Sequence, residues 1–197
     1  MRPLLAGARG GRRGRRALHP LHRGGRRHGG LRNDPARRWL GPGVFLLILV
    51  LDFLTKQWAL ASLADRGFVE VTGFFNLVLV WNRGVSFGMF QAGSEAGRWL
   101  LVGVALLVSA LLVVWLRRER RKLPRLAIWL ILAGALGNVV DRVRYGAVVD
   151  FLDFHAFGYH WPAFNVADSA IVVGAALLVG DSLLGGREAL PVAGRQK

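Results

Sequence analysis

Four long apolar segments are the feature that most constrains what this chain can fold into. They run over residues 41–63, 97–116, 124–141 and 162–184. About 20 apolar residues are needed to cross the hydrocarbon core of a bilayer as a helix, and a helix that is apolar all round, as 97–116 is, cannot be buried in a chain of 197 residues. The sequence therefore predicts an all-α membrane protein with four transmembrane helices, the first opening with Pro42 in its first turn.

Most of the net positive charge lies outside these apolar segments, at the start of the chain. Residues 1–39 carry 12 Arg and one Asp, which is +11 of the total net charge of +15. This stretch has too little apolar surface to offset the entropy of ordering it, so it is predicted to be a disordered tail, followed by a membrane domain over 40–186 and a short tail over 187–197. An alternative is that the first tail binds anionic lipid or nucleic acid, although a charge run of this kind is more typical of a solvated segment.

The charges of the connecting loops predict the orientation in the membrane. The loop 117–125 is net +5 and the end from residue 185 is net +2, whereas 64–96 and 141–162 are each net −1. Lys and Arg stay preferentially on the cytoplasmic side. Both termini are therefore expected in the cytoplasm, and the two acidic loops on the outer side.

The first outer loop has the pattern of a small sheet. Residues 68–90 are rich in β-branched and aromatic side chains with partial alternation, interrupted by Asn82-Arg83-Gly84, which predicts strands with a turn at Gly84. Because open sheet edges are not tolerated in lipid, we expect this sheet at the outer water boundary with its apolar side toward the membrane.

Ionisable and amide side chains within the spans are candidates for function, because they are costly to insert. Asp52 and Lys56 lie four residues apart on the first helix and can form an ion pair, whose role, structural or catalytic, the spacing leaves open. Asn138, Asp141 and Arg142 share one face of the third helix.

Four carboxylates are expected to gather at the outer end, on Asp141, Asp150, Asp153 and Asp168. Two carboxylates close together in a partly dry site share one proton, so that one activates a water and the other donates to a carbonyl oxygen. Spacing alone does not say which two form such a pair.

Other kinds of site are disfavoured. The chain has no Cys, which removes thiolate zinc sites and cysteine nucleophiles. His155 and His160 have no carboxylate or thiol partner at a useful spacing, so no metal site and no cofactor are predicted.

Five motifs stand in a fixed order along the chain: Asp52-Phe-Leu-Thr-Lys56, Asn82-Arg-Gly84, Gly137-Asn138-Val-Val-Asp141-Arg142, Val149-Asp150-Phe151 and Phe164-Asn165-Val-Ala-Asp168. In order and spacing they resemble the lipoprotein signal peptidases, the type II aspartyl signal peptidases of bacteria. The likeness covers residues 42–184. It departs at Val85 and Ser86, where the family usually has two alanines.

The resemblance implies four transmembrane helices with an extracytoplasmic β-cradle, in the bacterial inner membrane. It implies an aspartyl endopeptidase that removes the signal peptide from diacylglyceryl-modified prolipoproteins, cleaving on the N-terminal side of the lipidated Cys. It places the catalytic dyad on Asp150 and Asp168. Supporting positions of the site fall on Asn82, Gly84, Asn138, Arg142, Asn165, Asp52 and Lys56.

A small proton-coupled transporter subunit is the main alternative, since intramembrane acids and bases also build proton relays. That function predicts acidic groups distributed through the membrane depth, whereas the polar residues here gather at the outer end, with Asp52 the main exception. The expected partners are prolipoprotein substrates and membrane lipid, without nucleic acid, and the expected state is a monomer.

Overall fold

A computed structural model of the chain describes residues 35–84 and 95–185. Its four helices are α1 (Pro35–Leu63), α2 (Glu95–Arg118), α3 (Lys122–Tyr145) and α4 (Val166–Gly185). All four are long and apolar enough to cross a membrane, which confirms the four predicted spans. Of the predicted tail over 1–39, residues 1–34 lie outside the described residues, whereas 35–39 belong to α1 and are not disordered. The segment 187–197 also lies outside the described residues.

Three helix boundaries differ from the prediction by four residues or more. Helix α4 begins at Val166 and not at 162, because Phe164 forms a β-bridge with Leu152 before the helix starts. Helix α1 begins at Pro35, so Pro42 lies inside the helix and not in its first turn. Helix α3 continues one turn past the predicted end, which keeps Asp141 within it. It stops where Gly146 takes a left-handed conformation (φ +76°) and donates its N–H to the carbonyl of Arg142 at 3.0 Å, a C-terminal cap that favours glycine.

Helix α3 is the central helix. Half of its most apolar part is buried, against 17% for each of the other three helices, whose apolar side chains face outward as lipid requires. Glycines allow α3 and α4 to approach closely: a Cβ on Gly134 would lie 2.2 Å from the carbonyl oxygen of Ala167, and one on Gly174 would lie 2.7 Å from that of Ala127. Small residues at such contacts are typical of helix packing in membranes.

A four-stranded antiparallel sheet completes the fold, in the order β1 (Phe68–Thr72), β2 (Phe75–Asn82), β3 (Val148–Ala156) and β4 (Tyr159–His160). The prediction of a sheet confined to 68–90 is corrected here, because its other half comes from the α3–α4 connection. The β1–β2 turn lies at residues 73–74, whereas β2 ends at Asn82 and is followed by Gly84 with a φ of +97°. Residues 85–90 lie outside the described part of the chain.

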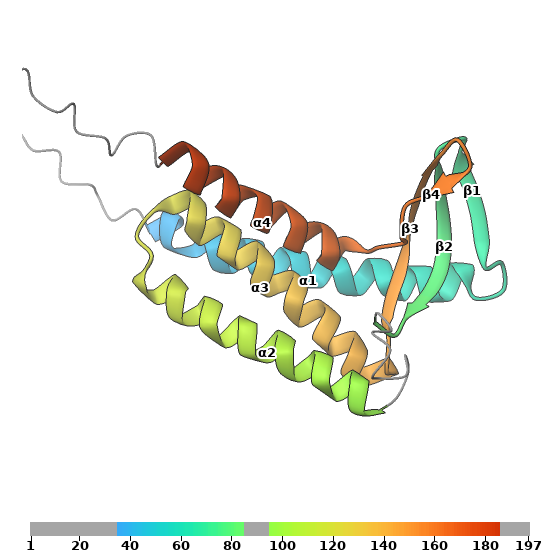
Figure 1. The fold of residues 1–197 in the computed structure, drawn as a ribbon, viewed down its shortest axis with the longest axis horizontal. Coiled ribbons are helices and arrows are strands. Elements are labelled where there is room, and N and C mark those ends of the chain that lie inside the picture. The colour runs from blue at the N-terminus through green and yellow to red at the C-terminus, as the bar shows by residue number, and fades with distance from the viewer. Residues whose placement is uncertain (1–34, 85–94, 186–197) are drawn as a thin grey trace, which may run out of the picture. The chain divides into compact units, whose positions relative to one another are not determined.

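The sheet lies at one end of the helix bundle, which we call the sheet end (Figure 1). It packs against the last turns of α1, where Ala59 and Leu63 meet Phe151 of β3 in an apolar cluster. The α2–α3 connection, the start of α1 and the end of α4 lie together at the opposite end, which we call the far end.

Candidate active site

Asp150 lies in the interior of β3, with only 1% of its surface exposed. Strand pairing of β2 with β3 brings Asn82 alongside it, and the Asn82 Nδ2 donates to Asp150 Oδ2 at 2.9 Å. The Nδ2 of Asn165 donates to the other oxygen, Oδ1, at 2.7 Å. Both carboxylate oxygens are therefore held by amide donors in a nearly dry position.

Asp168 lies in the first turn of α4, where it forms a reciprocal cap with Asn165. The N–H of Asp168 donates to Asn165 Oδ1 at 2.9 Å, and the N–H of Asn165 donates to Asp168 Oδ2 at 3.3 Å, as in a capping box. The Nδ2 of Asn138 donates to Asp168 Oδ1 at 2.8 Å. The local fold of the helix start thus fixes this carboxylate, at the positive end of the α4 dipole.

Asn165 joins the two acids. Its side chain is fully buried, and it contacts Asp150 through Nδ2 and Asp168 through its backbone N–H. Its Nδ2 also lies 3.3 Å from Asn138 Oδ1. The structure therefore brings Asp150 and Asp168, 18 positions apart in the sequence, to the two sides of one asparagine.

The environment of Asp150 changes its acidity. Burial raises the pKa of this carboxyl from its ordinary value of 3.8 to about 6, and the nearby charge of Asp168 acts in the same direction, while the Asn82 and Asn165 amides act against it. Asp150 is thus suited to hold a proton at a pH where an ordinary aspartate has lost it.

A buried ionic network lies next to this pair. Lys56 is 1% exposed, and its Nζ lies 2.7 Å from Asp52 Oδ2, 2.8 Å from Asp141 Oδ2 and 3.2 Å from Asn138 Oδ1. The predicted Asp52–Lys56 pair is present, but it is part of a larger group in which one cation serves two acids. Charges this deep are tolerated only when paired and hydrogen-bonded.

The same two acids tie the network to the site through backbone donors. Asp52 Oδ1 accepts from the N–H of Ala167 at 2.9 Å, and Asp141 Oδ2 accepts from the N–H of Val149 at 3.2 Å. Ala167 precedes Asp168, and Val149 precedes Asp150. The network therefore positions the backbone directly before each carboxylate.

Asp153 lies apart from this group, with different partners. It accepts from Asn76 Nδ2 at 2.9 Å and contacts His160 Nδ1 at 2.9 Å. Although burial acts to raise it, these hydrogen bonds bring the pKa of Asp153 below its ordinary value. The expectation that His160 has no carboxylate partner is wrong, because β3–β4 pairing places it beside Asp153. His155 stacks on His160 with ring centres 4.9 Å apart.

No group of three or more potential metal ligands occurs among the described residues. Of the four candidate carboxylates, Asp141 is paired with Lys56 and Asp153 with His160. Asp150 and Asp168 are bound by neutral amides and by backbone. This arrangement, one proton-holding acid beside a second acid, is suited to general acid–base chemistry on water and a carbonyl group.

Arg142 and Gly84 border the pair. The Nη1 of Arg142 lies 3.4 Å from the carbonyl of Asn138, and its buried Nε has no hydrogen-bond partner among the described residues. Gly84 has φ +97° and donates its N–H to Asn82 Oδ1 at 2.9 Å. This bond fixes which way the Asn82 amide points, with its Nδ2 toward Asp150.

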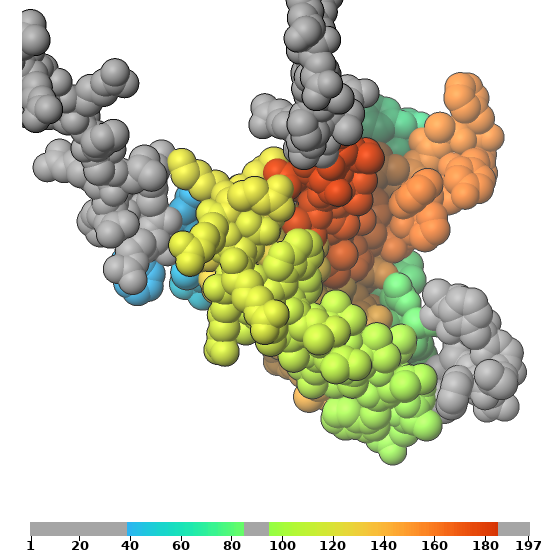
Figure 2. Space-filling view, turned by 60° about the vertical axis from the view of Figure 1, so that its left-hand side comes forward, coloured from blue at the N-terminus to red at the C-terminus, as the bar shows by residue number. Residues whose placement is uncertain are grey.

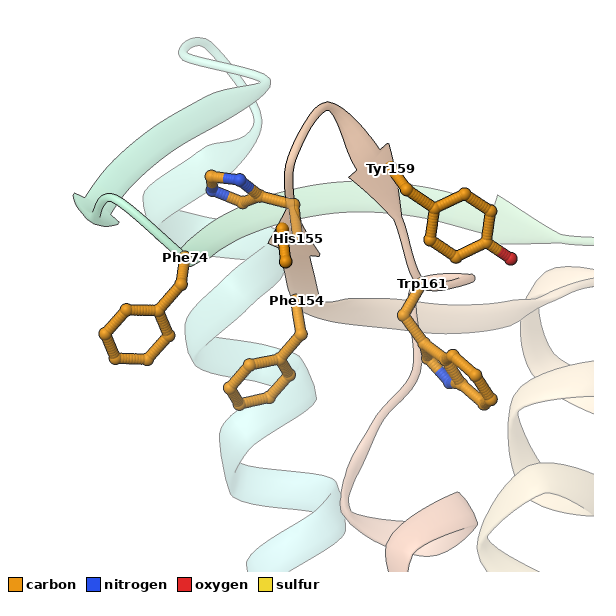
Figure 3. Close-up of a pocket in the computed structure, with 6 residues that line it drawn as sticks. Phe74, Phe154, His155, Tyr159 and Trp161 are labelled. Atoms are coloured by element: carbon orange, nitrogen blue, oxygen red, sulfur yellow. The ribbon is translucent and has the colours of Figure 1, made fainter.

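An aromatic surface beside the sheet was not predicted from the sequence. A cavity of about 380 Å³ is lined by Phe74, Phe154, His155, Ala156, Tyr159 and Trp161. The rings of Phe74, Phe154 and Trp161 point to the side of the sheet that carries the helices, whereas His155 points away (Figure 3). These residues come from the β1–β2 turn, from β3 and β4, and from the position after β4. Strand pairing brings Phe74 beside the others, so no local pattern could have grouped them.

Comparisons with known proteins agree with this architecture. The family model described as "Signal peptidase (SPase) II" matches residues 44–184. A lipoprotein signal peptidase of Ralstonia nicotianae is 52% identical over 147 residues, which cover 74% of this chain and 83% of that protein. Another, of a Methylobacterium species, is 51% identical over 142 residues, 71% of this chain and 86% of the relative.

Solved structures show the same fold. A bacterial membrane enzyme solved by the in meso method at 2.3 Å superposes with a TM-score of 0.66 and 28% identity, over 80% of this chain and 94% of that one. A second such enzyme, solved at 1.9 Å, gives 0.64 and 31%, over 73% and 92%. With the family model matching well over half of the residues, the chain belongs to the signal peptidase II family of membrane peptidases.

Proposed function

We propose that this protein removes the signal peptide from diacylglyceryl-modified prolipoproteins, cleaving on the N-terminal side of the lipidated Cys, with Asp150 and Asp168 as an aspartyl dyad. The observation that carries the proposal is the shared contact of both carboxylates with the buried Asn165. The names of the relatives support the substrate class. The transporter alternative is not supported, since the family and the relatives are peptidases.

The chemistry needs one water and one shared proton. The ionised carboxylate, on Asp168, takes a proton from water as its oxygen attacks the scissile carbonyl, while protonated Asp150 donates to the carbonyl oxygen. The tetrahedral intermediate then collapses: the C–N bond breaks, the proton held by Asp168 passes to the leaving nitrogen, and a hydroxyl proton of the intermediate returns to Asp150 as the C=O bond re-forms. The products are the signal peptide with a free carboxyl group and the lipidated Cys with a free α-amine.

The surrounding residues hold this geometry. Asn82, Asn138 and Asn165 position the carboxylates through the contacts described above. The Asp52–Lys56–Asp141 network fixes the backbone before each of them. Arg142, whose Nε is buried without a partner, is placed to hold a polar backbone or lipid group of the substrate through its several donors.

The proposed location is the bacterial inner membrane, with both termini in the cytoplasm and the sheet end at the outer face. One observation supports this orientation, and a second supports the position of the sheet end at a membrane–water interface. The positive loop 117–125 lies at the far end. The exposed aromatic residues at the sheet end, including Trp161, are of the kind that gathers at membrane–water interfaces. A diacylated substrate held in the outer leaflet then meets the dyad at its own depth, and a monomer suffices.

The test is incubation of the purified protein in detergent or nanodiscs with a lipidated prolipoprotein and with the same precursor lacking the lipid, followed by a gel shift. We expect cleavage of the lipidated precursor directly before its lipidated Cys, shown by mass spectrometry of the product. Cleavage at another bond, or equal cleavage of the unlipidated precursor, would contradict the proposed substrate.

A further inference from the structure

A second cavity, of about 340 Å³, lies at the far end of the bundle, away from the catalytic residues. It is formed by the start of α1, the first turns of α3 and the α2–α3 connection. In Figure 2, where this end comes forward, the residues around the α2–α3 connection (yellow) stand out at the surface. One part of its wall is apolar, from Leu40, Leu126 and Trp129, and the other part is cationic, from Arg120, Lys122 and Arg125.

The cations of this wall are not neutralised by the protein. The acidic residue of the α2–α3 connection, Glu119, forms an ion pair with Arg121, whose Nε lies 3.4 Å from Glu119 Oε1. Arg121 also pairs with Asp181 of α4. Among the residues that the structure describes, the side chains of Arg120 and Lys122 form no ion pair. The cavity is therefore positively charged.

Arg125 is held in a fixed position at this wall. Its Nη1 donates to the carbonyl oxygens of Leu116 and Glu119, at 3.1 and 3.0 Å, at the end of α2. In the described structure these bonds use a single nitrogen of the guanidinium, so Nη2 and Nε remain as donors. A planar group with several donors is well matched to phosphate oxygens.

The aromatic part of the wall is equally fixed. A Cβ on Gly41 would lie 2.1 Å from the indole Nε1 of Trp129, so the indole rests against the α1 backbone where only glycine leaves room. Its other neighbour is Phe45, with ring centres 5.6 Å apart in an edge-on arrangement. Tryptophan at the end of a membrane span typically lies at the level of the lipid headgroups.

We propose that this cavity binds one anionic phospholipid, with its phosphate between Arg120, Lys122 and Arg125 and the upper part of an acyl chain against Leu40 and Leu126. Basic pockets between transmembrane helices are suited to anionic headgroups. The apolar wall continues into the exposed apolar surface of α1, which includes Leu46 and Leu47. That continuity favours a lipid over a free phosphate ion, because a phosphate ion has no apolar part that could contact the apolar wall of the cavity.

The test is native mass spectrometry of the full-length protein in detergent, titrated with dioleoyl-phosphatidylglycerol, with dioleoyl-phosphatidylcholine and with inorganic phosphate. We expect one phosphatidylglycerol molecule to bind more tightly than phosphatidylcholine. The double variant Arg120→Gln/Lys122→Gln should weaken that first binding step about 25-fold, since each cation near an anionic headgroup contributes about fivefold. The matched control is Arg117→Gln/Arg118→Gln, which lowers the net charge equally at the end of α2, outside the cavity.

The control is expected to weaken binding by no more than about twofold, because charges outside contact distance are screened by salt. Equal losses in the two double variants would overturn the proposal, since they would indicate attraction to the general charge of the loop. Equal binding of the two lipids, or displacement of phosphatidylglycerol by inorganic phosphate, would overturn it as well. The assay uses no substrate, so its failure would leave the proposed peptidase function untouched.

Discussion

Replacing Lys56 by Met tests whether the buried ionic network supports the site. Lys56 contacts Asp52 and Asp141 at 2.7 and 2.8 Å and is 1% exposed, so its removal leaves two buried carboxylates without a cation. Breaking a buried pair by removing one partner costs about 3–5 kcal/mol. In a protein of this size that corresponds to a lower Tm by about 6–20 °C.

The measurement is thermal unfolding in detergent, followed by tryptophan fluorescence, for Lys56→Met and for the triple variant Asp52→Asn/Lys56→Met/Asp141→Asn. The triple variant has no buried charge at these positions, so it should recover at least half of the lost Tm. Arg66→Met, which removes an exposed cation outside the network and outside the proposed lipid site, is the matched control and should unfold as the wild type does. A single variant as stable as wild type, or a triple variant no better than the single one, would refute the reasoning.

Three further predictions concern the site and its supports. Because the pKa of Asp150 is raised from 3.8 to about 6 in the folded protein, its contribution to stability is fully present below pH 3.8 and is lost as the pH rises through 6. Asp150→Asn removes this dependence. The Tm of this variant relative to wild type should therefore be higher at pH 8 than at pH 5 by the equivalent of about 1.4 kcal/mol, since about half of the full loss of about 3 kcal/mol has already occurred at pH 5. Gly134→Val places side-chain atoms against the α4 backbone and should lower both Tm and cleavage rate, whereas Gly103→Ala, with open space around it, should change neither. Gly84→Ala strains a backbone at φ +97° and weakens the bond that orients Asn82, so kcat should fall about tenfold or more, which corresponds to a loss of about 1.4 kcal/mol. The control Gly73→Ala, in the β1–β2 turn, should cleave as wild type does. Equal rates for these two glycine variants would argue against the positioning role of Gly84.

The helices were predictable from the sequence because the membrane leaves so few alternatives. An apolar run of about 20 residues in a small chain has only one stable form in lipid, and all four runs are helical. The ends were less predictable, since Pro42 was compatible with a first turn but lies inside α1.

The sheet was only half predictable because strand pairing is not local. Strand β2 pairs with β3, and the paired residues lie far apart in the chain, as Phe75 with Phe154 and Asn82 with Val148. Nothing within 68–90 indicates that partner. The pairing of β3 with β4 places His160 beside Asp153, a contact that the sequence analysis did not predict.

In the candidate site, too, the contacts between residues distant in the sequence were not predictable. Spacing along one helix predicted the pair of Asp52 and Lys56, because residues four apart share a face. It did not indicate that Lys56 also reaches Asp141, which lies on another helix. Residue chemistry alone left four acids as equal candidates. Their observed partners separate Asp150 and Asp168, the two that the family resemblance implied, from Asp141 and Asp153.

The central claim is that Asp150 and Asp168 act together on the scissile bond. The most direct measurement is the cleavage rate of a lipidated prolipoprotein by Asp150→Asn and by Asp168→Asn, each first shown to be folded by its thermal unfolding in detergent. Asp153→Asn serves as the matched control, since Asp153 is a buried acid of the same strand with different partners. The account predicts no detectable cleavage by either dyad variant and near-normal cleavage by the control; turnover retained by a dyad variant, or lost in the control alone, would contradict it.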